Sequence, residues 1–393
     1  MKKTTRFPLG AFEKIETPFY YYDTDLLRYT LAALTAALPP QAKAHYAVKA
    51  NINPRMMKII AASGMGADCV SGGEIAAAIE AGFLPQDIVF SGVGKSDKEI
   101  LAALRCGIGC FNVESVEELD VIDQLAATCG VTAPVALRLN PHIDAHTHKY
   151  ITTGLSENKF GIDITVADKA IERALALPNV RLRGAHFHIG SQILTLEPFR
   201  LLCRRIGEWL RQWRARGIFM EYINVGGGLG IDYDAPDEHP VPDFAAYFDV
   251  FANELALDEG QTLHFEPGRS VVAQCGSLIT RVLYVKQGLN KKFAIVDAGM
   301  NDLLRPALYQ ARHEIENLTE PYAQTDTYDV VGPVCESADV FATDKELPAV
   351  VRGSMLAIRS AGAYGETMAS RYNSRELPCA YFSDDLLPAG QKI

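Results

Sequence analysis

Short apolar runs alternate with longer amphipathic stretches over the first two thirds of the chain. Residues 25–38 have the spacing of an amphipathic helix and end at a Pro-Pro pair. Helical stretches such as 73–81, 116–127 and 199–216 separate the runs that follow. The runs with strand character cover residues 44–48, 67–70, 88–90, 110–113, 135–139, 182–187, 222–225 and 262–265. Eight strand–helix repeats predict a closed (β/α)8 barrel of the TIM type.

The pattern changes after about residue 270. Apolar runs at 277–285, 293–296, 327–331 and 350–358 are separated by turn residues, with few helical stretches between them. This predicts a second, all-β domain, built as a β-sandwich or β-barrel. The predicted fold class is therefore α/β plus all-β. The predicted domains are the barrel over 24–268 and the β domain formed by 1–23 plus 269–393.

Composition and charge are those of an ordinary globular protein. The 393 residues are 48% hydrophobic and 22% charged, which suffices for more than one core. A net charge of -10 disfavours nucleic acid and anionic membrane surfaces as partners, so a small molecule is expected. The N-terminus lacks a secretory apolar stretch, and a cytoplasmic location is predicted. The eight cysteines form no CxxC pair, which favours reduced thiols.

Charged residues follow two of the predicted barrel strands. Lys49 directly follows the run 44–48. Desolvation at this strand end would depress the pKa of the lysine, and a neutral amine could form a Schiff base with a carbonyl. A surface lysine with its ammonium in water is the alternative. Glu266 directly follows the run 262–265, and Arg269 comes three residues later, after a Pro-Gly turn. The carboxylate could keep a pyridine nitrogen protonated and the arginine could bind an anion, although a surface ion pair is also possible.

Histidines occur at a strand end and in a loop. His188 could stack on an aromatic ring, with Ser191 nearby to bind an anion, although a core histidine is the commoner fate. The loop histidines His142, His146 and His148 could serve zinc, but their spacing matches no standard ligand set. We therefore predict no metal site, and we expect the loop at 142–154 to act as a lid.

Consecutive glycines follow another strand. Gly226, Gly227 and Gly228 would let backbone N–H groups approach a phosphate, although a tight turn explains them as well. In the β region, Cys335 stands beside Glu336 in a Gly-Pro turn, where a thiol could donate a proton. A buried structural cysteine is the alternative.

Taken in chain order, six segments resemble the pyridoxal-phosphate-dependent decarboxylases of the alanine-racemase-like fold. The matching segments are 46–51, 188–192, 226–230, 266–269, 335–337 and 361–365. The resemblance covers about residues 17–378. Six segments in the same order and spacing are far more specific than any one of them.

The resemblance implies that the cofactor is pyridoxal 5′-phosphate, carried by Lys49 as a Schiff base. It implies three catalytic residues, which are Lys49, His188 and Cys335. In the family, the histidine stacks on the cofactor ring and the residue matching Glu266 faces the pyridine nitrogen. The implied cofactor-binding residues are Lys49, His188, Ser191, Gly226, Gly227, Gly228, Glu266, Gly268, Arg269 and Tyr364.

The resemblance also implies a homodimer with shared active sites, to which Cys335 contributes from the neighbouring subunit. Arg305 favours a distal carboxylate, so the implied reaction converts meso-2,6-diaminopimelate to L-lysine and CO2, the last step of lysine biosynthesis. Carboxynorspermidine, ornithine or arginine as the substrate, a racemase and a regulatory homologue remain as alternatives. The implied substrate-binding residues are Arg269, Arg305, Tyr309, Glu336 and Tyr364.

Overall fold

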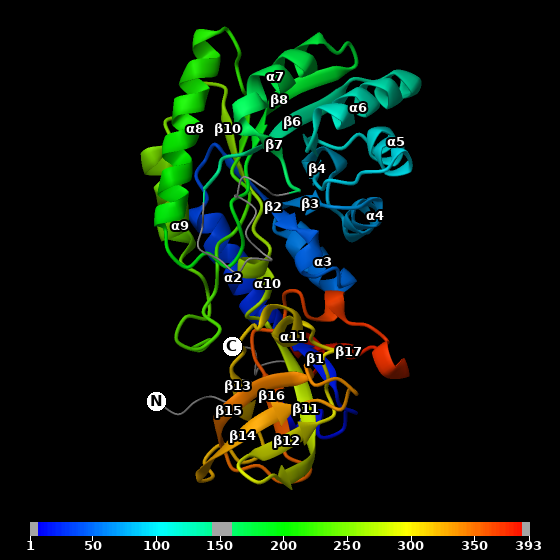
Figure 1. The fold of residues 1–393 in the computed structure, drawn as a ribbon, viewed down its shortest axis with the longest axis vertical. Helices are drawn as coiled ribbons and strands as arrows, with labels where there is room; N and C mark the ends of the chain where they lie inside the picture. Colours follow the sequence, from blue (N-terminus) through cyan, green and yellow to red (C-terminus); the bar gives the residue numbers. More distant parts are fainter. Residues whose placement is uncertain (1–6, 144–158, 387–393) are drawn as a thin grey trace. The chain divides into compact units, whose positions relative to one another are not determined.

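The computed structural model describes residues 7–143 and 159–386, which form two compact units. The barrel unit consists of the described parts of 31–230 and 242–269. The β unit consists of the described parts of 1–30, 231–241 and 270–393. Figure 1 shows the elements of both units.

Within the described residues, eight parallel strands form the predicted barrel. Their sheet order runs from β5 through β4, β3, β2, β10, β9 and β8 to β6, and the pairing of β5 with β6 closes it. The strands are β2 (Ala42–Ala47), β3 (Gly66–Cys69), β4 (Ile88–Phe90), β5 (Cys110–Val113), β6 (Ala133–Asn140), β8 (Val180–His186), β9 (Tyr222–Asn224) and β10 (Thr262–Phe265). Each overlaps a predicted run, so the barrel prediction is confirmed. A short strand, β7 (Ile162–Asp163), pairs with β6 outside the barrel.

Helices connect the strands and surround them. Helices α4, α5 and α6 cover one side of the strands, and α8 and α9 cover the opposite side (Figure 1). Their ends carry clear signals, such as the Ser96–Glu99 capping box of α5 and the left-handed Gly130 that ends α6. None of the described helices is long and apolar enough to cross a membrane. The helices are α2 (Thr24–Ala37), α3 (Pro54–Ala62), α4 (Gly72–Ala81), α5 (Asp97–Cys106), α6 (Val116–Cys129), α7 (Ala167–Ala176), α8 (Glu197–Ala215) and α9 (Phe244–Glu254).

Beyond residue 270, the β unit contains the predicted strands and three that the sequence analysis missed. Strands β13, β16, β11, β12, β14 and β15 are neighbours in that order, and β1 joins β11 to β17. The missed strands are β13, β15 and β17, and the predicted strand at 350–358 begins only at Met355. The strands are β1 (Phe19–Tyr22), β11 (Gly276–Gln287), β12 (Lys292–Val296), β13 (Ile315–Asn317), β14 (Thr325–Val331), β15 (Val340–Pro348), β16 (Met355–Ile358) and β17 (Cys379–Phe382).

The core of the β unit joins its N-terminal segment to its sheet. Phe12, Phe19 and Tyr21 pack edge to face, and burial of such rings strongly favours folding. The unit also holds the short α-helices α1 (Leu9–Phe12), α11 (Arg305–Tyr309) and α12 (Ser383–Leu386), and α10 (Arg269–Val272) begins at the last residue of the barrel unit and continues in the β unit. The buried core residues are Phe7, Phe12, Phe19, Tyr21, Ile279, Leu318, Met355 and Ala357.

Two buried histidines join neighbouring strands β2 and β10 of the barrel. His45 Nδ1 donates to the Asp87 carbonyl oxygen at 3.0 Å, so its Nε2 accepts from His264 Nδ1 at 2.9 Å. Thr262 Oγ1 donates to the Glu221 carbonyl oxygen at 3.2 Å and also lies 3.0 Å from His264 Nε2. Both ring nitrogens of His45 are used in the neutral form. Burial is the main cause that lowers the pKa of His45 to about 4.

We expect this pair to make the barrel sensitive to acid. Because the pKa of His45 falls from 6.5 to about 4 on folding, its neutral form stabilises the protein fully above pH 6.5. That contribution, about 3 kcal/mol, is lost as the pH falls toward 4. The free energy of unfolding should therefore fall less in His45→Asn than in the wild type when the pH is lowered from 7 to 4. Urea unfolding at several pH values measures this, with the exposed His239→Asn as the control. Equal pH dependence in wild type and His45→Asn would contradict the prediction.

Candidate active site

The predicted residues of the barrel unit lie at the C-terminal ends of its strands. Lys49 lies in the 3-10 turn Val48–Ala50, directly after β2. Glu266 follows β10 directly, and His188 and Gly226 each lie two residues beyond a strand, β8 and β9 respectively. Because the strands are parallel, these residues share one mouth of the barrel.

The Lys49 side chain is exposed to solvent, whereas its neighbours Val48 and Ala50 are buried. The prediction of a desolvated lysine is therefore wrong, because the strand ends at Ala47 and the 3-10 turn redirects the chain before Lys49. The charge of Lys49 still acts on Glu266. The amine is thus accessible to an incoming molecule while it stays within range of a buried carboxylate.

Three side-chain N–H groups hold the Glu266 carboxylate. Asn224 Nδ2 and Asn112 Nδ2 donate to Oε1 at 2.7 and 3.1 Å. His186 Nε2 lies 3.0 Å from Oε2. Burial opposes the charge, but His186 together with His188 and Lys49 holds the pKa of Glu266 well below its ordinary value. The carboxylate is therefore ionised at neutral pH and fixed in direction.

Asp68, at the end of β3, is a second buried carboxylate that the sequence analysis missed. Ser91 Oγ donates to Asp68 Oδ1 at 2.7 Å and accepts from Asn112 Nδ2 at 2.9 Å. Hydrogen bonds thus connect Asp68 to Glu266 through Ser91 and Asn112. Burial and then the charge of Glu266 raise the pKa of Asp68 to about 7. Asp68 could have been identified from the sequence, because an aspartate within an otherwise apolar strand is unusual.

His188 presents a neutral ring at the barrel mouth. Burial lowers its pKa well below the ordinary value, and the charges of Arg138 and Lys49 lower it further. The Gly227 N–H group donates to Nδ1 at 3.3 Å, so the neutral ring carries its proton on Nε2. The ring is half-buried, which leaves part of it available for stacking.

The glycine turn leaves no room for side chains. A Cβ at Gly226 would lie 2.5 Å from the Phe187 carbonyl oxygen, and one at Gly227 would lie 2.2 Å from the Glu266 carbonyl oxygen. Gly228 has a φ of 111°, which L side chains rarely adopt. Only glycine fits all three positions, and the turn forms a cradle with no Cβ atoms between backbone and ligand.

The predicted anion-binding residues lie beside this turn. The Ile193 N–H group donates to the Gly228 carbonyl oxygen at 2.9 Å, which brings the Ser191 loop against the glycines. The Arg269 guanidinium donates to Ser191 Oγ at 3.1 Å. A Cβ at Gly268 would lie 2.9 Å from a side-chain carbon of β2. A hydroxyl and a buried guanidinium therefore meet next to the cradle.

Other predicted residues lie in the β unit. Arg305 begins α11 and Tyr309 ends it. The buried Arg305 lies over the Tyr233 ring at 4.5 Å, and its Nη1 is 2.7 Å from His313 Nε2. These contacts hold the guanidinium in place.

The remaining predicted residues occupy two loops of the β unit. Cys335 and Glu336 are exposed on the loop between β14 and β15. Tyr364 has a φ of 56°, and a Cβ at its neighbour Gly362 would lie 2.0 Å from the Val272 carbonyl oxygen. Close backbone packing therefore explains the small residues around Tyr364.

A family model described as "Pyridoxal-dependent decarboxylase, pyridoxal binding domain" matches residues 25–273. The chain belongs to the pyridoxal-dependent decarboxylases. This matched segment contains the strands of the barrel and every predicted residue at its mouth.

The similarity to known decarboxylases extends over nearly the whole chain. The diaminopimelate decarboxylase of Bacteroides thetaiotaomicron is 58% identical over 97% of this chain and 99% of that protein. The diaminopimelate decarboxylase of Aquifex aeolicus is 43% identical over 91% of this chain and 84% of that protein. The structure of diaminopimelate decarboxylase from Helicobacter pylori complexed with L-lysine superposes with a TM-score of 0.90 at 42% identity. The superposition covers 96% of this chain and 94% of the Helicobacter pylori chain.

The mouth of the decarboxylase barrel fits the family's cofactor, pyridoxal 5′-phosphate. An ionised, fixed carboxylate suits a protonated pyridine nitrogen. The glycine cradle beside Ser191 and Arg269 suits a phosphate, and Lys49 offers an accessible amine. The residues present therefore meet each chemical requirement of this cofactor.

The predicted loop histidines are described only in part. His142 Nε2 lies 2.7 Å from Asp163 Oδ2. His146, His148 and most of the predicted lid at 142–154 lie outside the described residues. Among residues 7–143 and 159–386, no group of three His, Cys, Asp or Glu could hold a metal ion.

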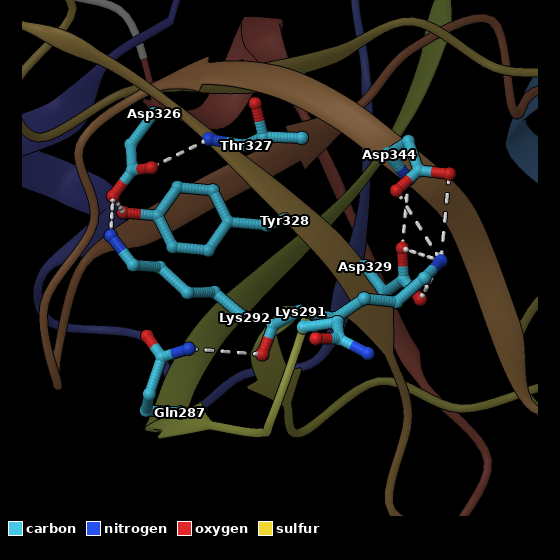
Figure 2. A pocket seen from close by; sticks show the side chains of 9 residues that line it. Gln287, Lys291, Lys292, Asp326, Thr327, Tyr328, Asp329 and Asp344 are labelled. Atoms are coloured by element: carbon cyan, nitrogen blue, oxygen red, sulfur yellow. Dashed lines mark hydrogen bonds and ion pairs between the residues drawn. The ribbon is translucent and has the colours of Figure 1, made fainter.

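The β unit of the decarboxylase has a surface pocket of about 220 Å³, lined by residues of β11, β12, β14 and β15 and of the loop between β11 and β12 (Figure 2). Lys292 pairs with Asp326, and Lys291 pairs with Asp329 at 2.9 Å and Asp344 at 3.3 Å. The two lysines of this pocket are thus paired with three aspartates. We interpret it as a surface ion-pair network, which adds little to stability or binding.

Proposed function

We propose that the protein decarboxylates meso-diaminopimelate and releases L-lysine and CO2, completing lysine biosynthesis. The observation that carries the proposal is the fixed anion of Glu266 beside the accessible amine of Lys49 and the glycine cradle. The 58% identical relative from Bacteroides thetaiotaomicron is named for this activity, which supports the choice of substrate.

The residues at the barrel mouth would hold the cofactor. Lys49 would bind it through Nζ, and the Glu266 carboxylate would keep a proton on its pyridine nitrogen. The neutral His188 would lie on its ring without adding charge. When bound, the cofactor accepts the electron pair left by the departing CO2. The phosphate would bind at Ser191, Gly226, Gly227, Gly228, Gly268, Arg269 and Tyr364.

The substrate's other end would be held by residues of the β unit. Arg305 would bind the distal carboxylate with its fixed guanidinium, assisted by Tyr309 and Tyr364. Glu336 would bind the distal amino group. As the bond to CO2 breaks, the Cys335 thiol would give its proton to the same carbon. We propose that this thiol acts across a cytoplasmic homodimer, so each active site uses both subunits.

A substrate comparison tests the function. We expect kcat/KM for meso-diaminopimelate to exceed that for L-ornithine or L-arginine by about 10³-fold or more, because a buried arginine facing a distal ammonium is strongly unfavourable. Coupled assays of lysine release and CO2 release measure the rates. Comparable turnover of ornithine would contradict the proposed substrate and favour the rival decarboxylases.

A further inference from the structure

The loop that carries Cys335 and Glu336 is anchored at its base and exposed at its tip. The buried Asp339 carboxylate accepts hydrogen bonds from the backbone N–H groups of Val334 and Met300, each at 2.7 Å. The tip itself is exposed. These contacts at the base involve neither the Cys335 nor the Glu336 side chain.

Two adjacent residues contact this exposed tip from the 3-10 turn Tyr372–Ser374. Tyr372 Oη donates to Glu336 Oε1 at 2.5 Å. The Cys335 N–H group donates to Asn373 Oδ1 at 3.0 Å. One contact holds the carboxylate, and the other holds the backbone that carries the thiol.

The backbone of the turn is unusual and is held from its far end. Asn373 has φ 53° and ψ 28°, and Ser374 has φ 57°, in the left-handed region that most L residues avoid. The Arg375 guanidinium donates to the Asp297 carbonyl oxygen at 2.7 Å. Such conformations persist where surrounding contacts impose them, and they concentrate at functional sites.

We propose that Tyr372 and Asn373 are positioning residues for the decarboxylation. Tyr372 orients the Glu336 carboxylate toward the substrate's amino group, and Asn373 fixes the backbone at Cys335 so that the thiol points at the reacting carbon. This inference rests on the proposed function. The hydrogen bond to Glu336, and then its charge, raise the pKa of Tyr372, so the phenol remains a donor at neutral pH. The phenol occupies Oε1 and leaves Oε2 for the substrate.

The two residues should cause different kinetic defects. Tyr372→Phe is expected to raise KM for meso-diaminopimelate about tenfold while kcat changes less than about twofold, because a hydrogen bond to a charged group contributes on this scale. Asn373→Ala is expected to lower kcat about tenfold with little change in KM, because a misplaced proton donor slows only the chemical step. Steady-state lysine release measures both constants.

Matched variants separate positioning from general damage. Asn373→Asp keeps an acceptor oxygen and tolerates the left-handed backbone, so it should retain the wild-type kcat. Tyr322→Phe removes the hydroxyl of a tyrosine that is 89% exposed and should change neither constant. In a Glu336→Gln background, Tyr372→Phe should raise KM no further, because the carboxylate that Tyr372 orients has already been replaced by an amide.

A binding measurement removes turnover from the test. By calorimetry, L-lysine should bind Tyr372→Phe holoenzyme about tenfold more weakly than the wild type. Wild-type constants in both single variants, or additive effects of Tyr372→Phe and Glu336→Gln, would overturn the inference. Failure of the wild type to release lysine would overturn the proposed function itself, and it would appear before any variant is made.

Discussion

Replacing Lys49 with alanine is expected to abolish turnover of meso-diaminopimelate, lowering kcat on the order of 10⁴-fold or more. The exposed amine at the end of β2 is the group that we propose binds the cofactor covalently. Without this amine, only noncovalent contacts would hold the cofactor. The substrate's amino group would also have no lysine amine to displace from the cofactor. Assays of lysine release measure the rate, and absorbance of the purified protein above 300 nm reports the bound chromophore.

The control for this variant is another exposed lysine of the barrel unit. Lys58 lies on α3 and is exposed, so Lys58→Ala should keep the wild-type rate and spectrum. Thermal unfolding should show that Lys49→Ala remains folded, because the side chain is not part of the core. Normal turnover by Lys49→Ala would show that another group holds the cofactor, and it would refute the proposed site.

The barrel could be predicted because its strands are buried on both faces. Segments such as β3 and β4 are short and apolar, and glycines, helix caps and prolines mark the boundaries between them. The missed β15 lies at the edge of its sheet and has only two buried residues, so its sequence resembles that of a polar loop. The late start of β16 has a local cause, a turn in which Ser354 N–H donates to the Val351 carbonyl oxygen.

The residues that we propose contact the cofactor could be predicted from the sequence, but the residues that hold them in place could not. Glu266 stands at a strand end, which is visible in the chain. Its donors Asn112, His186 and Asn224 come from three other strands, β5, β8 and β9. Only closure of the barrel brings them together, since they lie between 42 and 154 residues from Glu266 in the chain. No local pattern encodes such a network.

The exposure of Lys49 has a similar explanation. A lysine after an apolar run indicates a strand end, but whether its side chain is buried depends on how the following residues turn. Here Asn51 N–H donates to the Val48 carbonyl oxygen, which closes a tight turn around Lys49. The placement of residues 231–241 could not be predicted from the sequence either. They follow the barrel strand β9 in the chain but belong to the β unit, where Asp237 pairs with Arg359.

Replacing Cys335 with alanine is expected to lower kcat for lysine release about 10³-fold, within the range contributed by a positioned general acid. The thiol is exposed on its loop, and Asn373 holds its backbone. Because the thiol is not among the residues proposed to hold the cofactor, the spectrum of the bound cofactor should be unchanged. Cys379→Ala alters another exposed cysteine of the same unit and should retain the wild-type rate. A Cys335→Ala enzyme with wild-type kcat would exclude this thiol as the proton donor.

Mixing the two inactive variants tests whether the active sites are shared. If each site takes Lys49 from one protomer and Cys335 from its partner, a dimer of one Lys49→Ala chain and one Cys335→Ala chain contains one intact site. Random reassortment makes half of the dimers mixed, so activity should recover to about a quarter of the wild-type value. If both residues of a site came from one chain, every site in the mixed dimer would lack one of them. Mixing after mild dissociation would then restore no activity, and the site would lie within one subunit.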